Sequence, residues 1–169
     1  EDGTLQGLLE SLRVPYVGSG VNASSLCIDK VLAKERMAQV GLPQVDFVAL
    51  TDTSWRLERD RIESDVARLG LPVWVKPARL GSSVGISRVD SPDGLAEAVA
   101  LALGHDPRVI VEASSAGREV EVSVMERPLP GGGFDLVASP VGEITLPGAA
   151  EGEWYDYARK YGSGGMELV

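Results

Sequence analysis

The stretch VWVKPARLGSSVGISRV, residues 73–89, constrains the fold of this chain more than any other. Two β-rich runs enclose a short turn of glycine and serine, and Lys76 comes before that turn rather than after it. A Walker-type phosphate loop needs its lysine after the glycines and a helix directly behind, so that the helix N-terminus meets the phosphates. The order found here predicts instead a flap between two strands.

The composition of this flap suits an anion, because glycine and small hydroxyl residues let the backbone approach a phosphate closely. We expect the flap to present the backbone N–H groups of Gly81, Ser82, Ser83 and Val84. Taken alone, such a turn is more often structural. Lys76 strengthens the hypothesis, because a partly buried ammonium at a strand end needs an anionic partner. A phosphate or a carboxylate would serve, and a surface position for the ammonium also stays open.

Helical and extended patterns alternate irregularly along the chain. Helical spacing predicts helices over residues 4–12, 22–40, 91–103 and, less regularly, within 51–69. Helix signals include N-cap candidates at Asn22, Ser24, Ser25 and Ser91, and an end at Gly104. Short β-rich runs predict strands at 45–50, 72–77, 85–89, 108–113, 118–126 and 134–141. Because short turns join many neighbouring strands, the pattern favours an α+β fold over a doubly wound parallel sheet.

Composition limits the classes of function. The 169 residues are 44% apolar, which suffices for a core, and the net charge of −9 argues against general binding to nucleic acid or anionic membranes. No apolar run approaches the roughly eighteen residues of a membrane span, and no signal-peptide pattern opens the chain. We therefore expect a cytoplasmic protein.

The rare residue types narrow the chemistry further. Only four lysines accompany twelve arginines, so an anionic ligand must meet a local cluster of cations. Cys27 is the single cysteine and, among apolar neighbours in a helical pattern, is expected to be a buried, inert thiol. His105 is the single histidine and is expected in a loop. Because the sequence contains only one histidine, histidine-based triads are excluded within it.

A second group of candidates lies in VIVEASSAGREVEV, residues 109–122. Glu112 ends one predicted strand and Glu119 begins the next. The backbone between them can offer a donor and an acceptor to a purine edge, and a carboxylate at the strand start can accept from ribose hydroxyls. For any single glutamate, a strand end that faces water is the more common alternative.

Four stretches occur in one order along the chain: PYVGSGVNASSLCIDK, VWVKPARLGSSVGISRV, VIVEASSAGREVEV and WYDYARKYGSGG. Together they resemble the D-alanine:D-alanine ligase family of the ATP-grasp superfamily, over essentially the whole chain. The resemblance implies an α+β ATP-grasp fold that holds a nucleotide between two α+β subdomains. Residues 1–18 would end an N-terminal domain, 19–113 would form the central subdomain, and 114–169 would begin the C-terminal subdomain with its mobile ω-loop.

The resemblance also implies site residues. The phosphates would be contacted by Lys30, Lys76 and Lys160 and covered by Gly81, Ser82, Ser83 and Val84. The adenine would be held by Glu112 with the backbone of Ala113 and Ser115, and the ribose by Glu119. Lys34, one helical turn beyond Lys30, receives no role, and we expect it to face solvent.

Catalysis is implied for Ser82, Lys160 and Tyr161. Tyr161 would bond to Ser82 near the second substrate, and the Lys160–Tyr161 pair favours D-alanine over D-lactate there. A packed aromatic cluster is the alternative for this tyrosine-rich segment.

The implied reaction joins two D-alanines with ATP and Mg²⁺ through an acylphosphate. The metal ligands are expected beyond Val169, none is predicted within the chain, and the chain alone is expected to be inactive. A homodimer is implied as well. Two alternatives stay open: another ATP-grasp carboxylate–amine ligase, including a D-alanine:D-lactate type, and a non-catalytic nucleotide-binding module.

Overall fold

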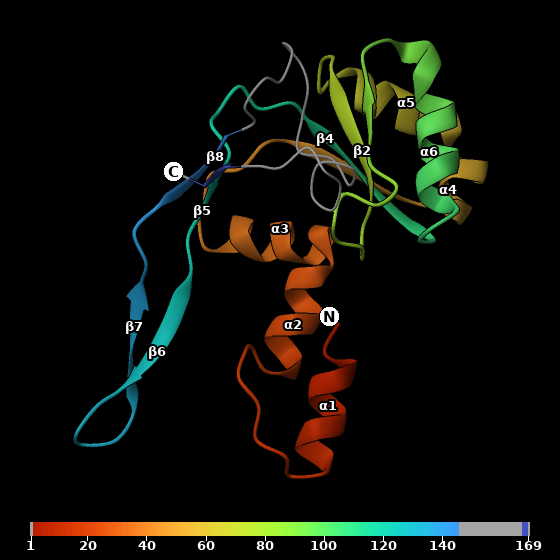
Figure 1. Cartoon of the computed structure of the whole chain (residues 1–169). Helices are drawn as coiled ribbons and strands as arrows, with labels where there is room; N and C mark the ends of the chain where they lie inside the picture. Colours follow the sequence, from red (N-terminus) through yellow and green to blue (C-terminus); the bar gives the residue numbers. More distant parts are fainter. Residues whose placement is uncertain (1, 146–166, 169) are drawn as a thin grey trace. The chain divides into compact units, whose positions relative to one another are not determined.

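The structure is a computed structural model that describes residues 2–145 and 167–168, the last two by their backbone only. It contains two compact units, residues 1–115 and 116–169, which are described separately (Figure 1). The first unit mixes helices with an antiparallel sheet, whereas the described part of the second consists of strands. The predicted α+β class is confirmed.

A four-stranded antiparallel sheet forms the centre of the first unit. Its strands, in spatial order, are β1 (Phe47–Thr51), β4 (Arg108–Ala113), β2 (Val73–Pro77) and β3 (Ser87–Val89). β3 pairs with β2 as the predicted hairpin partner, but only as far as Val75, while β2 stays paired with β4 to its end. The flap therefore begins where β2 loses one of its two neighbours.

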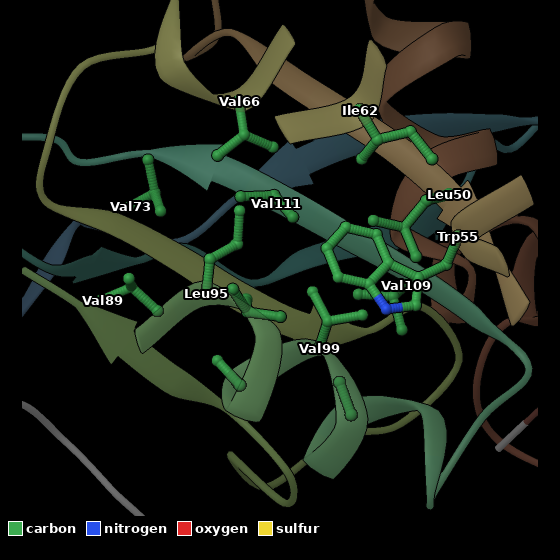
Figure 2. Packing of buried hydrophobic residues seen from close by; sticks show 13 residues of the cluster. Leu50, Trp55, Ile62, Val66, Val73, Val89, Leu95, Val99, Val109 and Val111 are labelled. Carbon is green, nitrogen blue, oxygen red and sulfur yellow. The ribbon is translucent and has the colours of Figure 1, made fainter. Parts of the chain in front are cut away.

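One face of this sheet packs against α5 (Arg59–Ala67) and α6 (Leu95–Leu103). The strand residues on this face include the fully buried valines Val73, Val75, Val109 and Val111. Figure 2 shows side chains of both helices meeting these strands, Ile62 and Val66 from α5 and Leu95 and Val99 from α6. Because each buried aliphatic side chain stabilises the fold by roughly 1.5–3 kcal/mol, this face fixes the strands that carry the site.

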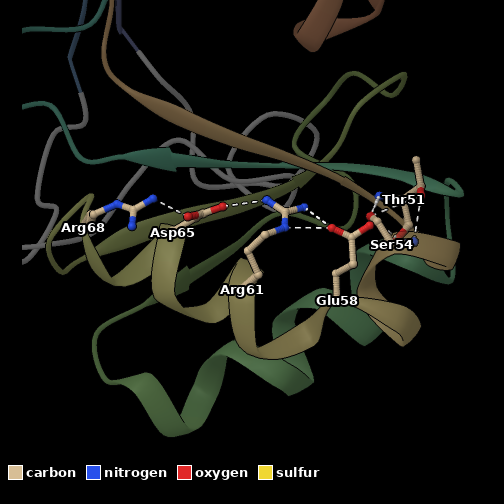
Figure 3. A network of polar contacts seen from close by, with 6 residues as sticks. All are labelled: Thr51, Ser54, Glu58, Arg61, Asp65 and Arg68. Atoms are coloured by element: carbon tan, nitrogen blue, oxygen red, sulfur yellow. Dashed lines mark hydrogen bonds and ion pairs between the residues drawn. The ribbon is translucent and has the colours of Figure 1, made fainter.

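The outer face of α5 carries a row of charged residues (Figure 3). Arg61 forms ion pairs with Glu58 at 2.6 Å and with Asp65 at 2.8 Å, and Asp65 also pairs with Arg68. Exposed pairs of this kind contribute at most about 1 kcal/mol each. Their effect is to keep one side of α5 in water while the other packs on the sheet.

Short helices begin and end where the sequence signals lie. α4 (Asp52–Leu57) starts with a capping box between Thr51 and Ser54. The turn η1 (Pro92–Gly94) follows Ser91 at the predicted N-cap position, and α6 ends at Gly104 as predicted. The predicted N-terminal helix is α1 (Thr4–Ser11).

The prediction of one helix over residues 22–40 is wrong, because the chain forms α2 (Val21–Ile28) and α3 (Lys30–Gln39). Between them Asp29 has an extended backbone, with ψ of 101°, and its carboxylate caps the first turn of α3. The N-cap of α2 is Gly20, not one of the predicted caps Asn22, Ser24 or Ser25.

Cys27 is exposed, so the prediction of a buried thiol is wrong. Helix α2 has only partly buried and exposed positions, and Cys27 is one of the exposed ones. Its apolar neighbours in the sequence therefore do not cover it.

The second unit contains β5 (Val120–Glu121), β6 (Val124–Pro128), β7 (Phe134–Ala138), β8 (Gly142–Thr145) and β9 (Glu167–Leu168). The continuous strand predicted over 118–126 is interrupted, because β5 pairs with β8 whereas β6 pairs with β7. The change of partner occurs at Ser123, which exchanges hydrogen bonds with Ser139. Within the described ranges, no helix is long and apolar enough to span a membrane.

Candidate functional site

The second face of the sheet in the first unit carries charge. Alternation along β2 and β4 turns Lys76 and Glu112 away from the valine core. Helix α3 lies over this face, where Val31 packs against Ile110. One helix and two strands therefore bring the predicted residues Lys30, Lys76 and Glu112 to the same side of the unit.

Glu112 lies between two ammonium groups. Its Oε2 is 2.5 Å from Nζ of Lys76, and its Oε1 is 2.9 Å from Nζ of Lys34. The carboxylate side chain is only 10% exposed, so burial alone would raise the pKa of Glu112, but the two lysines outweigh burial and lower it. Of the partners that the sequence left open for Lys76, the structure places a carboxylate beside it.

Lys34 does not face solvent, and that prediction is wrong. Its side chain is 13% exposed, and beyond Glu112 its Nζ donates to the carbonyl of Val45 at 3.3 Å and lies 5.4 Å from the ring centre of Phe47. One turn separates it from Lys30, so both lie on the side of α3 that meets the sheet. The amphipathic pattern of α3 is weak because this inward side carries lysines.

The ammonium of Lys30 is held by backbone carbonyls at the base of the flap. Its Nζ donates to the carbonyls of Pro77 at 3.0 Å, Ala78 at 3.3 Å and Leu80 at 2.5 Å. Burial, followed by the charge of Lys76, lowers the pKa of Lys30. Lys30 thus ties the start of α3 to the end of β2 and to the first residues of the flap.

The backbone of the flap enters the left-handed region twice without glycine. Ser82 has φ of +54° and Ser83 has φ of +59°. Such conformations cost on the order of 1 kcal/mol each and are concentrated at ligand-binding loops. The N–H of Val84 donates to the carbonyl of Gly81 at 3.2 Å and closes a turn at the tip.

Two buried aspartates anchor the surroundings of the flap. Asp106 accepts from the Arg79 backbone at 2.8 Å and from its guanidinium through both carboxylate oxygens. Asp29 accepts from Nη1 of Arg108 at 3.0 Å while it caps α3. Because buried charges must be paired, these two pairs hold α3, β4 and the base of the flap in fixed positions.

The other predicted nucleotide contacts lie at and beyond the end of β4. The N–H of Ala113 donates to the carbonyl of Asp46 at 2.9 Å, within the first unit. Ser115 is the last residue of that unit, and its side chain is exposed. Glu119 lies in the second unit, one residue before β5, and is exposed too.

Lys160 and Tyr161 lie outside the described residues. Among the residues that the structure does describe, there is no group of three or more His, Cys, Asp or Glu side chains that could hold a metal ion. The described site is therefore a cluster of lysines around one carboxylate, beside a strained flap.

Comparison of the chain with known proteins identifies a matching family. The family described as “D-ala D-ala ligase C-terminus” matches residues 36–169. The D-alanine–D-alanine ligase of Mycobacterium avium (strain 104) is 51% identical over 163 residues, which are 95% of this chain and 42% of the relative. That of Mycobacterium tuberculosis (strain ATCC 25618 / H37Rv) is 50% identical over 170 residues, with 99% and 43% covered.

Solved structures of ligases also match this chain. The VanG D-Ala:D-Ser ligase from Enterococcus faecalis matches with a TM-score of 0.77 and 33% identity, over 99% of this chain and 45% of its own. The D-alanine–D-alanine ligase from Coxiella burnetii matches with a TM-score of 0.72 and 35% identity, over 84% and 40%.

The fold, with its lysine-flanked flap on an antiparallel sheet, and these structural neighbours place the chain in the ATP-grasp class. More narrowly, the chain belongs to the D-alanine–D-alanine ligase family, whose C-terminal part the match describes. It spans 42–43% of the length of the relatives given above.

The residues that sequence analysis missed are those with distant partners. Asp29 carried a signal, since an aspartate directly before a lysine-rich helical run is a common N-cap. The pairing of Asp106 with Arg79 depends on the β2–β4 register, and that of Lys34 with Glu112 depends on how α3 packs on β4. No local pattern contains that information.

Proposed function

We propose that this chain forms the ATP-binding part of a ligase that joins two D-alanines for the bacterial cell wall. The observation that carries the proposal is that three of the four lysines gather beside the flap: Lys34 and Lys76 pair with Glu112, and Lys30 is held at the base of the flap. In a chain with a net charge of −9, this local excess of cations suits a polyanion. Family membership supports ATP and D-alanine as the ligands.

In this proposal the residues of the first unit bind and orient ATP. Lys76 and Lys30 neutralise the phosphates, and residues 81–84 of the flap close over them and exclude water. Glu112 and the backbone of Ala113 and Ser115 hold the adenine. Glu119 of the second unit accepts from the ribose hydroxyls.

The reaction has two steps. A carboxylate oxygen of the first D-alanine attacks the γ-phosphorus of ATP and ADP leaves, which gives an acylphosphate. The amine of the second D-alanine then attacks the acyl carbon, phosphate leaves, and the amine loses a proton as the peptide bond forms. Lys160 would stabilise charge on the transferred phosphoryl group, and Tyr161 with Ser82 would orient the second substrate.

Further parts of the proposal rest on family resemblance. Residues 1–18, 19–113 and 114–169 would belong to the end of an N-terminal domain and to two ATP-grasp subdomains. The protein would be a cytoplasmic homodimer. Mg²⁺ would assist phosphoryl transfer, with ligands outside the described residues.

The test uses the full gene product that carries this sequence, with ATP, Mg²⁺ and D-alanine. We expect phosphate release together with D-alanyl-D-alanine, identified by mass, with D-lactate and D-serine offered in competition. Lys76→Ala should lower kcat/KM for ATP on the order of 100-fold, because a cation at the transferring phosphate is lost.

The matched control is Arg36→Ala, which removes an exposed cation from α3 that bonds only to Gln39 in the described part of the chain. Its activity should equal that of the wild type. Turnover with a different amino acid but not with D-alanine would select another carboxylate–amine ligase. Unchanged ATP affinity in Lys76→Ala would favour a non-catalytic module and contradict the proposal.

A further inference from the structure

The carboxylate of Glu112 is shared by two lysines that come from different elements. Lys76 lies on β2 and bonds to Oε2, whereas Lys34 lies on α3 and bonds to Oε1. The side chain of Glu112 is 10% exposed, so the loss of both cations would leave a buried charge unpaired. Such a charge is strongly destabilising.

Lys76 cannot serve Glu112 and a phosphate equally well at the same time. Its Nζ lies 2.5 Å from Oε2 of Glu112, and a phosphate of higher charge would draw this ammonium away from the carboxylate. If Glu112 had no second cation beside it, this movement would leave its buried carboxylate unpaired and would therefore be unfavourable. The position of Lys34 thus decides how easily Lys76 can engage ATP.

Lys34 is held by contacts that involve neither Lys76 nor the flap. Its Nζ donates to the carbonyl of Val45 and lies over the ring of Phe47. Its own carbonyl accepts from Nε2 of Gln44 at 2.8 Å. These contacts hold the ammonium at Oε1 of Glu112, whereas Lys76 pairs through Oε2.

We propose that Lys34 is a positioning residue for ATP binding, which keeps Glu112 paired and oriented while Lys76 turns to the phosphates. This inference rests on the proposed function. Lys34 itself contacts no phosphate in this scheme. Its effect on ATP passes through Glu112, and this distinguishes it from a general contribution to charge or stability.

The experiment is a double-mutant cycle on the full gene product, with the dissociation constant of Mg-ATP measured by calorimetry. Lys34→Met should raise this constant about tenfold or more, and Lys34→Arg should restore most of the affinity. In a Glu112→Gln background, which has no buried carboxylate to compensate, Lys34→Met should change the constant by less than about threefold. Arg36→Met, an exposed cation on the same helix, is the matched control and should match the wild type.

Thermal unfolding of each variant shows whether it is folded. Where Lys34→Met fails this check, Lys34→Gln replaces it with the same direction of change, because it keeps a polar N–H donor but loses the charge and is one atom shorter. Equal ATP affinity in the wild type and the Lys34 variant would overturn the inference and leave the proposed function standing. If Lys34→Met weakened ATP binding equally in the wild-type and the Glu112→Gln backgrounds, the inference would be overturned as well. A wild type that binds no ATP would overturn both proposals.

Discussion

Gly85 is the residue at which the flap returns to the fold. Its φ of +68° lies in the left-handed region, and a Cβ there would lie 2.6 Å from Cδ2 of His105 and 2.9 Å from Cγ of Pro77. Pro77 ends β2 and His105 lies in the turn after α6, so an added methyl group would displace the flap or strain its backbone. We expect Gly85→Ala to lower the free energy of unfolding by roughly 2–4 kcal/mol, measured by urea denaturation.

Gly81→Ala is the matched control for this change. Gly81 belongs to the same flap, its φ is outside the left-handed region, and nothing lies within 4 Å of the position of its Cβ. Its effect should stay within about 0.5 kcal/mol. Adding His105→Ala to Gly85→Ala should recover part of the loss, and an equal loss in both glycine variants would contradict contact with His105 as the cause.

At the scale of elements, the sequence predicts helices and strands best where one spacing of apolar residues continues without interruption. α6 and the β2–β3 hairpin were predicted closely because their caps, turn and alternation agree. The break at Asp29 was missed because helical spacing continues across it, and only the cap geometry separates α2 from α3. The pairing of Lys34 with Glu112 could not be predicted, since it depends on how α3 lies against β4.

Helix α3 carries both Lys30 and Lys34, so its first turn affects stability and the candidate site together. In Asp29→Ala the N–H groups of Val31 and Leu32 lose their acceptor, and Arg108 loses its carboxylate. Loss of an N-cap costs about 1 kcal/mol, and an unpaired partner adds a similar amount. We expect a fall of about 2 kcal/mol in the free energy of unfolding, together with weaker ATP binding.

Asp29→Asn separates the two contributions. Asparagine keeps an oxygen for the cap but removes the charge that faces Arg108. Its loss of stability should be about half that of the alanine variant, as measured by the same denaturation experiment. Equal losses would mean that the ion pair, rather than the cap, holds α3.

At the scale of the whole molecule, a net charge of −9 coexists with carboxylates that are buried and paired. Burial alone would raise the pKa of Asp106 above its ordinary 3.8 and that of Glu112 above 4.5, but Arg79 and Lys76 with Lys34 outweigh burial and lower both. The folded protein therefore releases these protons more readily than the unfolded chain. Stability from both groups is fully present above the ordinary values and is lost as the pH falls through the lowered ones.

We therefore expect the free energy of unfolding to be nearly constant from pH 7 to about 5 and to fall steeply below the ordinary pKa values. Urea denaturation at a series of pH values measures this profile. Asp106→Asn should lower stability at pH 7 by roughly 1–3 kcal/mol, because an amide cannot accept all the hydrogen bonds that Arg79 and Arg108 donate to the buried carboxylate, and should make the fall below pH 5 shallower. Asp52→Asn removes an exposed carboxylate that pairs with Arg56 and should leave the slope unchanged, since exposed pairs contribute little. If both variants kept the wild-type slope, the acid sensitivity would come from the overall charge and not from the buried pairs around the flap.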